Sequence, residues 1–196
     1  MNESDDTTTT DPIEARIAAR LAALRAERGL SLDALAARTG ISRATLSRVE
    51  HGTASPTAAM LGRLCAAYGW TLSRLMAAAE GTDGAPRHVR RADGPAWTDP
   101  ETGFRRRAAS PPGPGLRGEV VCCALPEGAA VAYPEPPGAG LEHHVLLLDG
   151  ALEVEMDGER ARLAPGDAYR RRLWGASRYA NPGPGEARYL VFIAQP

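Results

Sequence analysis

The sequence predicts an all-α domain of five short helices followed by an all-β domain. From residue 12 to about residue 79, apolar side chains recur at helical spacing between residues that favour helix starts and ends. From about Gly81 onward, proline and glycine become frequent, and the apolar residues fall into short runs separated by turn sequences. A chain of 196 residues, 43% of them hydrophobic, is long and apolar enough to form two folded domains.

The first helix is expected to begin at Pro12. Asp11 can cap it, proline is favoured at the first helical position, and Glu14 stands three residues after the cap. Apolar residues then follow at helical spacing until the helix ends near Gly29, and they are Ile13, Ile17, Leu21 and Leu24. Residues 1–11 are polar, and we expect them to form a disordered tail.

Four further helices are expected. The expected caps are Ser31, Ser42 and Thr71, the fourth helix is expected to start at Ser55-Pro56-Thr57, and the expected breaks between helices are Thr39-Gly40, Gly52 and Gly69. These helices complete a domain over residues 12–79. A linker is expected over residues 80–86, and the second domain over residues 87–196.

The second and third expected helices are joined by a tight glycine turn, an arrangement that places a helix in the major groove of DNA. The segment from Ile17 to Met76 also resembles the Xre/Cro/phage-repressor type of helix-turn-helix domain. The residues that carry the resemblance are Leu35-Ala36, Gly40-Ile41-Ser42, Leu46 to Gly52 and Ser55-Pro56-Thr57. The resemblance implies a lambda-repressor-like DNA-binding domain.

The third expected helix supplies the candidate DNA contacts, which are Ser42, Arg43, Ala44, Thr45, Ser47 and Arg48. Arginine can bond guanine through two hydrogen bonds, and small side chains can meet a thymine methyl group or a phosphate. Leu46 and Val49 would face the core instead. Asp33 stands where the family often has a glutamine that touches phosphate, and its charge would be repelled there. A five-helix bundle that binds no DNA is the alternative.

The overall charge fits a nucleic-acid partner only modestly. The chain has 23 basic residues, all of them arginine, against 24 acidic ones. Between Ile13 and Glu80, nine arginines stand against five acidic residues, a local excess of positive charge.

The sequence also indicates where the chain resides. No apolar run is long enough to cross a bilayer, and the acidic, threonine-rich N-terminus is unlike a signal peptide, so we expect a cytoplasmic protein with no membrane partner. The chain has three cysteines, Cys65, Cys122 and Cys123. Because their number is odd and two of them are adjacent, no disulfide framework is expected.

Eight short segments beyond residue 87 are expected to be β-strands. They are residues 88–91, 104–107, 119–125, 129–133, 144–148, 152–156, 160–163 and 188–193. Turns such as Asp149-Gly150, Asp157-Gly158 and Pro165-Gly166-Asp167 separate several of them. Many short strands with regular turns indicate a β-sandwich or barrel.

The second domain resembles the cupin family, a small jelly-roll barrel. The resemblance rests on the segments Leu141 to Gly158, Leu163 to Asp167 and Tyr179 to Gly183, whose turns fall at the expected places. A helix-turn-helix domain followed by a single cupin resembles a known type of bacterial transcription regulator. The resemblance therefore implies a homodimer that binds a double-stranded DNA operator and holds a small-molecule effector in the barrel.

Cupins commonly hold a metal with a His-x-His pair, a glutamate and a later histidine, and this chain keeps little of that set. By comparison with the family, His143 stands at the glutamate position and Ser177 at the last histidine, while residues 136–140 supply no ligand. A stable transition-metal site needs three or more protein ligands. We therefore expect no metal cofactor, although Cys122 or Cys123 could in principle combine with His143.

The expected ligand-binding residues of the barrel are His143, Tyr169, Arg171, Ser177 and Tyr179. Strand alternation puts Arg171 on the opposite face from its two arginine neighbours, and comparison with cupins places position 171 inward. An inward arginine beside a histidine would suit a carboxylate or another anion, including an amino acid. The alternative is an exposed or ion-paired triplet at 170–172. The triplet at 105–107 leaves a similar choice, between a solvated strand face and contact with DNA or a partner subunit.

These observations favour a ligand-responsive transcription regulator, acting as a repressor, rather than an enzyme. Two alternatives stay open. One is a cupin enzyme fused to a DNA-binding tether, which would need the full set of metal ligands that the sequence lacks. The other is an antitoxin-like DNA-binding protein whose barrel only dimerises.

Overall fold

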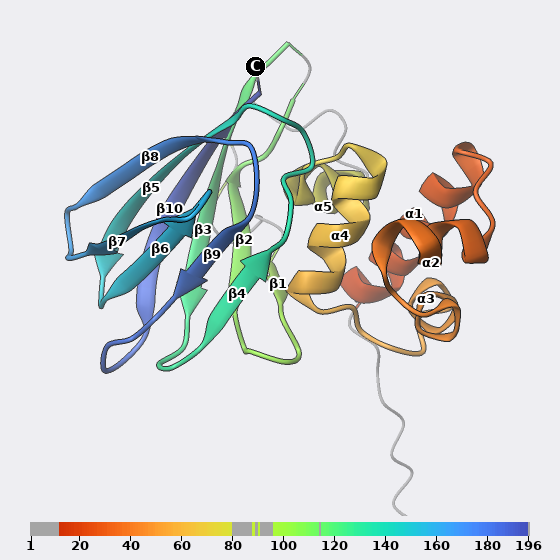
Figure 1. Ribbon diagram of the computed structural model, residues 1–196, viewed down its shortest axis with the longest axis horizontal. Helices are drawn as coiled ribbons and strands as arrows, with labels where there is room; N and C mark the ends of the chain where they lie inside the picture. The colour runs from red at the N-terminus through yellow and green to blue at the C-terminus, as the bar shows by residue number, and fades with distance from the viewer. Residues whose placement is uncertain (1–11, 80–87, 89, 91–95, 114, 196) are drawn as a thin grey trace, which may run out of the picture.

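The computed structural model describes residues 12–79, 88, 90, 96–113 and 115–195, in which a helical domain precedes an antiparallel β-sandwich (Figure 1). The helices are α1 (Pro12–Glu27), α2 (Leu32–Thr39), α3 (Arg43–Glu50), α4 (Ala58–Tyr68) and α5 (Leu72–Ala79). The strands are β1 (Ala96–Thr98), β2 (Arg105–Ser110), β3 (Gly118–Leu125), β4 (Ala130–Tyr133), β5 (Leu141–Asp149), β6 (Leu152–Met156), β7 (Glu159–Leu163), β8 (Ala168–Leu173), β9 (Ser177–Ala180) and β10 (Ala187–Ala194). The expected fold class is confirmed.

Side-chain caps begin four helices at the expected residues. The hydroxyl groups of Ser31, Ser42, Thr57 and Thr71 each accept a hydrogen bond from the backbone N–H three residues later, at 3.1 to 3.3 Å. Each such cap stabilises its helix by about 1 kcal/mol. Gly40 and Gly69 end α2 and α4 with φ of 66° and 62°, a left-handed conformation that glycine adopts without strain. Local residues therefore determine where these helices begin and end.

A leucine core and a shielded ion pair hold the helical domain together. Buried leucines come from all five helices, and they are Leu21, Leu24, Leu35, Leu46, Leu61, Leu64 and Leu75. The carboxylate of Glu50, at the end of α3, accepts hydrogen bonds from Nε and Nη2 of Arg25 on α1 at 2.8 and 2.7 Å. Because only 7% of the Glu50 side chain is exposed, this charge-assisted contact is protected from solvent and fixes α3 against α1.

The strands form two antiparallel sheets that face each other. Within the described residues, one sheet has the order β1-β2-β3-β10-β5-β8 and the other β4-β9-β6-β7. Side chains alternate along each strand, so Val145 and Leu147 of β5 and Tyr189 and Val191 of β10 point inward and are buried. The sandwich interior is therefore largely filled by side chains from both sheets.

Most expected strands are confirmed, but none of the eight expected segments covers β1, β8 or β9, of which β1 and β9 are only three and four residues long. The strand expected over residues 88–91 is wrong at His88 and Arg90, neither of which lies in a strand. The other two residues of that segment lie outside the described part of the chain. So do the expected tail over residues 1–11 and the expected linker over residues 80–86.

The helical domain packs directly on the β-sandwich, which we call the barrel, through α4 and α5. Helices α2 and α3 lie on the far side of the helical domain (Figure 1). Gly62 of α4 allows the ring of Tyr133 to approach, because a Cβ atom at residue 62 would lie 2.5 Å from Cδ1 of that ring. Asp99, which is 2% exposed, accepts a hydrogen bond of 3.1 Å from the backbone N–H of Ala58, the first residue of α4. A residue of the β domain thus caps a helix of the α domain.

Candidate DNA-binding surface and ligand cavity

Helix α3 presents most of the candidate DNA contacts to solvent. Ser42, Arg43, Ala44 and Arg48 are exposed, and Thr45 and Ser47 are half-buried. Leu46 and Val49, on the opposite face, are 1% and 3% exposed and belong to the core. The helix is therefore anchored by its apolar face and leaves its polar face free to enter a groove.

Asp33 of α2 lies beside this surface and contacts one of the candidate arginines. Its carboxylate oxygen is 3.4 Å from Nε of Arg43, and both side chains are well exposed. Such an exposed pair contributes little to stability, so the guanidinium group of Arg43 can exchange the carboxylate for a DNA acceptor at small cost.

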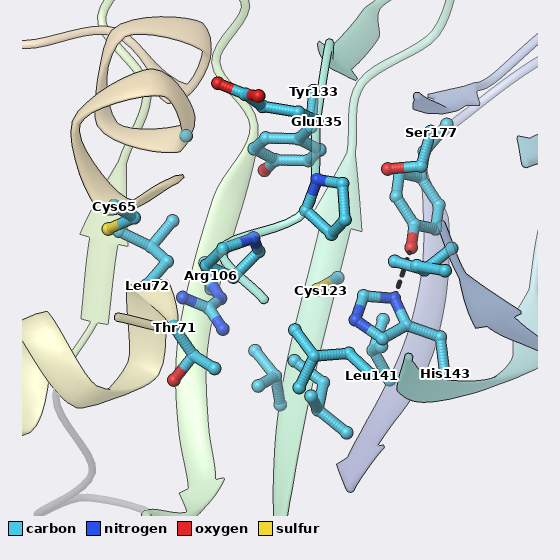
Figure 2. A pocket seen from close by; sticks show the side chains of 18 of the residues that line it. Cys65, Thr71, Leu72, Arg106, Cys123, Tyr133, Glu135, Leu141, His143 and Ser177 are labelled. Carbon is cyan, nitrogen blue, oxygen red and sulfur yellow. Dashed lines mark hydrogen bonds between the residues drawn. The ribbon is translucent and has the colours of Figure 1, made fainter. Parts of the chain in front are cut away.

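A second candidate site is a cavity of about 90 Å³ between the helical domain and the barrel (Figure 2). Helices α4 and α5 and the segment between them contribute Gly62, Cys65, Thr71 and Leu72. The barrel contributes Phe104, Arg106, Val121, Cys123, Tyr133, Glu135, Pro136, Pro137, Leu141, His143, Leu173, Ser177, Tyr179, Tyr189, Val191 and Ile193. Both domains thus form the wall of one cavity.

Three of the five expected ligand-binding residues line this cavity, namely His143, Ser177 and Tyr179. Nδ1 of His143 lies 3.0 Å from the hydroxyl of Tyr179, within hydrogen-bonding distance, and the ring of Tyr179 stacks on that of Tyr189. Figure 2 shows His143 and Ser177 on the side of the cavity opposite the helices. These side chains give the barrel side of the cavity polar groups.

His143 is uncharged at neutral pH. Burial, with smaller contributions from the charges of Arg106 and His144, lowers the pKa of His143 from 6.5 to about 4. A neutral imidazole can donate one hydrogen bond and accept one, but it cannot balance the charge of an anionic ligand.

The other two expected residues, Tyr169 and Arg171, do not line the cavity. Arg171 lies opposite His143 in the β5–β8 register. Its guanidinium group, however, pairs with Asp157, at 3.4 Å, and with Glu159 near the β6–β7 turn. Tyr169 packs against the core instead. Arg171 therefore does not enter this cavity, because two carboxylates from another hairpin hold its side chain.

The arginine that does line the cavity is Arg106, which the sequence analysis left as a choice between a solvated face and a partner contact. Figure 2 shows its guanidinium group close to Thr71, on the helical side of the cavity. Nη2 donates a hydrogen bond to the hydroxyl of Ser73, and Nη1 is buried without a hydrogen-bond partner. Strand alternation could have separated Arg106 from its neighbours, since Arg105 pairs with Glu186 and Arg107 donates to Sγ of Cys122.

The donor atoms around the cavity do not fit a metal ion. The positions at which cupins carry metal ligands are filled by prolines, His143 and Ser177, so a single imidazole nitrogen is the only strong donor among them. No group of three or more His, Cys, Asp or Glu side chains that could hold a metal occurs among the described residues. Burial raises the pKa of the Cys65 and Cys123 thiols to about 12, which keeps both protonated.

Comparison with known proteins agrees with this architecture. Residues 16–80 match the family model described as a helix-turn-helix domain. The chain is 27% identical over 174 residues to the HTH-type transcriptional regulator SutR of Escherichia coli, covering 88% of this chain and 91% of the relative. The crystal structure of an HTH_3 family transcriptional regulator from Vibrio cholerae superposes with a TM-score of 0.76 at 23% identity, over 95% of this chain and 99% of the other.

The barrel alone also matches the cupin_2 domain of an XRE family transcriptional regulator from Enterobacter cloacae, with a TM-score of 0.45 at 24% identity, over 47% of this chain and 97% of the other. Among the described residues, no helix is long and apolar enough to cross a membrane.

Proposed function

We propose that this chain, which is similar to XRE-type helix-turn-helix transcriptional regulators with a C-terminal cupin domain, is a repressor whose operator affinity depends on a small molecule held by the cupin. The observation that carries the proposal is the shared cavity, whose wall is built by α4, α5 and the barrel together. A DNA operator as partner also requires a cytoplasmic location.

The proposed DNA contacts are those of α3 and its cap. Arg43, Ala44, Ser47 and Arg48 would face base edges, and Ser42 and Thr45 would meet phosphate. The hydroxyl groups of Ser42 and Thr45 are 2.8 Å apart at the start of the helix, where backbone N–H groups also favour an anion.

A homodimer forms part of the proposal, because one recognition helix reads only half of a near-palindromic site. The outer face of the six-stranded sheet offers a surface for pairing. Leu146 and Leu148 of β5 and Phe192 of β10 are 37%, 46% and 41% exposed there, on the face opposite the buried Val145 and Val191. Pairing two such faces would remove these apolar side chains from water.

The ligand response follows from the position of the cavity. A molecule bound there would touch Leu72 and Thr71 from the helical domain and His143 from the barrel at the same time. Any change in how the two domains pack would then alter its affinity, and by linkage its binding would alter that packing. A bound dimer blocks its operator without further contacts, which supports repression as the mode of action.

The test is an operator selected in vitro with the full chain, followed by a screen for small molecules that change the dissociation constant of that operator. The proposal expects at least one molecule that shifts operator affinity. Variants with bulk added to the cavity, such as Ser177→Phe, should lose the shift and keep operator binding. If the chain binds its operator and no small molecule in the screen changes the dissociation constant, the result would favour a barrel that only dimerises.

A further inference from the structure

We propose that the cavity binds a small aliphatic monocarboxylate, whose carboxylate group pairs with the guanidinium group of Arg106. This inference rests on the proposed function and adds the chemical class of the effector. Its structural basis is Arg106, a residue that lines the cavity. Nη1 of its guanidinium group is a buried cationic donor that has no hydrogen-bond partner. Buried charged donors are rarely left unpaired, because the loss of hydration goes uncompensated.

The charges around the cavity favour an anion with one negative charge. Of the described residues that line it, only Arg106 is positively charged at neutral pH, since His143 is neutral. Glu135 lines the cavity as well, but it is exposed, and Figure 2 shows its carboxylate turned away from Arg106. A dianion such as phosphate would leave a second charge without a partner in this shielded space.

The buried acid Glu119 interacts electrostatically with Arg106 but forms no ion pair with it among the described residues. Glu119 of β3 is 4% exposed, and neither of its carboxylate oxygens has a hydrogen-bond partner. Burial raises the pKa of Glu119, although Arg106 and the nearby hydroxyl groups of Ser73 and Thr71 act against this. Glu119 does not line the cavity, so the cavity side of the Arg106 guanidinium group remains available to a ligand.

The size and lining of the cavity set the rest of the ligand. Its volume of about 90 Å³ is smaller than the dry cavity of about 150 Å³ that admits benzene. The walls beyond Arg106 carry aliphatic side chains, namely Val121, Leu141, Leu173, Val191 and Ile193. A short aliphatic chain fits these walls, so the expected ligands are acids of about three or four carbon atoms.

The same arginine gives the ligand a route to the helical domain. Nη2 of Arg106 donates to Ser73, which is 2% exposed on α5. A carboxylate paired with this guanidinium group would hold Arg106 in the orientation that bonds α5. The ligand would therefore stabilise the packing of the helical domain on the barrel.

Isothermal titration of the full chain with sodium propionate and sodium butyrate, each against its amide at equal ionic strength, tests the proposal. At least one acid should bind, and its amide should bind at least about tenfold more weakly, because a hydrogen bond to a charged group is lost. Arg106→Gln should weaken the acid by a similar factor. Arg105→Gln, which alters the neighbouring arginine paired with Glu186 on the outer face, should leave binding unchanged.

The acid–amide comparison uses the wild-type chain, so it decides the question even if Arg106→Gln does not fold. The proposal is overturned if no acid binds, if acid and amide bind equally, or if a folded Arg106→Gln keeps the affinity for the acid. A different ligand class that shifts operator affinity independently of Arg106 would refute only this inference. A carboxylate that binds through Arg106 without changing operator affinity would instead contradict the proposed ligand response.

Discussion

Arg106 of β2 donates a hydrogen bond from its guanidinium group to the hydroxyl of Ser73 on α5, and so joins the barrel to the helical domain. The bond lies beside the cavity that both domains line. With the bond from the N–H of Ala58 to Asp99, it gives the domain contact two polar connections in addition to its apolar packing. The geometry on one side of the cavity is thus tied to the domain that carries α3.

Removing the Ser73 hydroxyl should destabilise the protein. Ser73→Ala leaves the half-buried guanidinium group of Arg106 with a second unpaired nitrogen, at a cost of about 1 to 3 kcal/mol in the free energy of unfolding. Urea unfolding measures it. A double-mutant cycle with Arg106→Met isolates the pair, because Ser73→Ala should cost clearly less once the arginine is gone. Equal costs in both backgrounds would show that the bond contributes nothing.

Asp99→Ala should weaken the start of α4. The change leaves two backbone donors, the N–H groups of Ala58 and Glu101, without their acceptor. We expect a loss of about 1 to 3 kcal/mol in unfolding free energy. Glu101→Ala, which removes an exposed carboxylate two residues away, is the matched control and should change stability by less than about 0.5 kcal/mol. A similar small effect of both variants would contradict the cross-domain cap.

Gly62→Ala tests whether α4 packs on Tyr133, because helix propensity and the clash with that ring change the stability of the protein in opposite directions. Glycine in a helix interior is ordinarily less stable than alanine by about 1 kcal/mol, so the substitution should stabilise α4 in isolation. Here the new Cβ would lie 2.5 Å from Cδ1 of Tyr133, and we expect a lower melting temperature instead. In a Tyr133→Leu background, where the ring is absent, the same substitution should become neutral or stabilising. Stabilisation in the wild-type background would mean that α4 does not pack on Tyr133.

Acidification should destabilise the folded chain through His143. Its pKa is lowered to about 4 by burial, Arg106 and His144, against about 6.5 when unfolded. Between these values the unfolded chain binds a proton that the native chain does not, so stability falls as the pH drops from about 6.5 toward 4. His143→Gln should reduce the difference in unfolding free energy between pH 7.5 and pH 5. His51→Gln, at the exposed residue that follows α3, should retain it, and an unchanged difference in both variants would refute the assignment.

Local signals explain what the sequence could predict. Ser31, Ser42 and Thr71 cap their helices through neighbouring backbone groups, so their positions are readable without the rest of the fold. Period-two alternation likewise separated Arg171 from Arg170 and Arg172. What alternation cannot reveal is which distant group meets a side chain. Asp157 and Glu159 reach Arg171 from another hairpin, and helix α5 meets Arg106 only because the two domains pack together.

The most direct test of the account is the dissociation constant of the selected operator and of a scrambled duplex, for the wild type and for Arg48→Ala. Fluorescence anisotropy at fixed salt concentration provides the measurement, since salt alone changes such affinities. The wild type should prefer the operator, and Arg48→Ala should lose about 1 to 3 kcal/mol at one guanine position with relaxed specificity there. Arg38→Ala, on the exposed end of α2, should retain the preference. Equal binding of both duplexes by the wild type and Arg48→Ala would contradict sequence-specific recognition through α3.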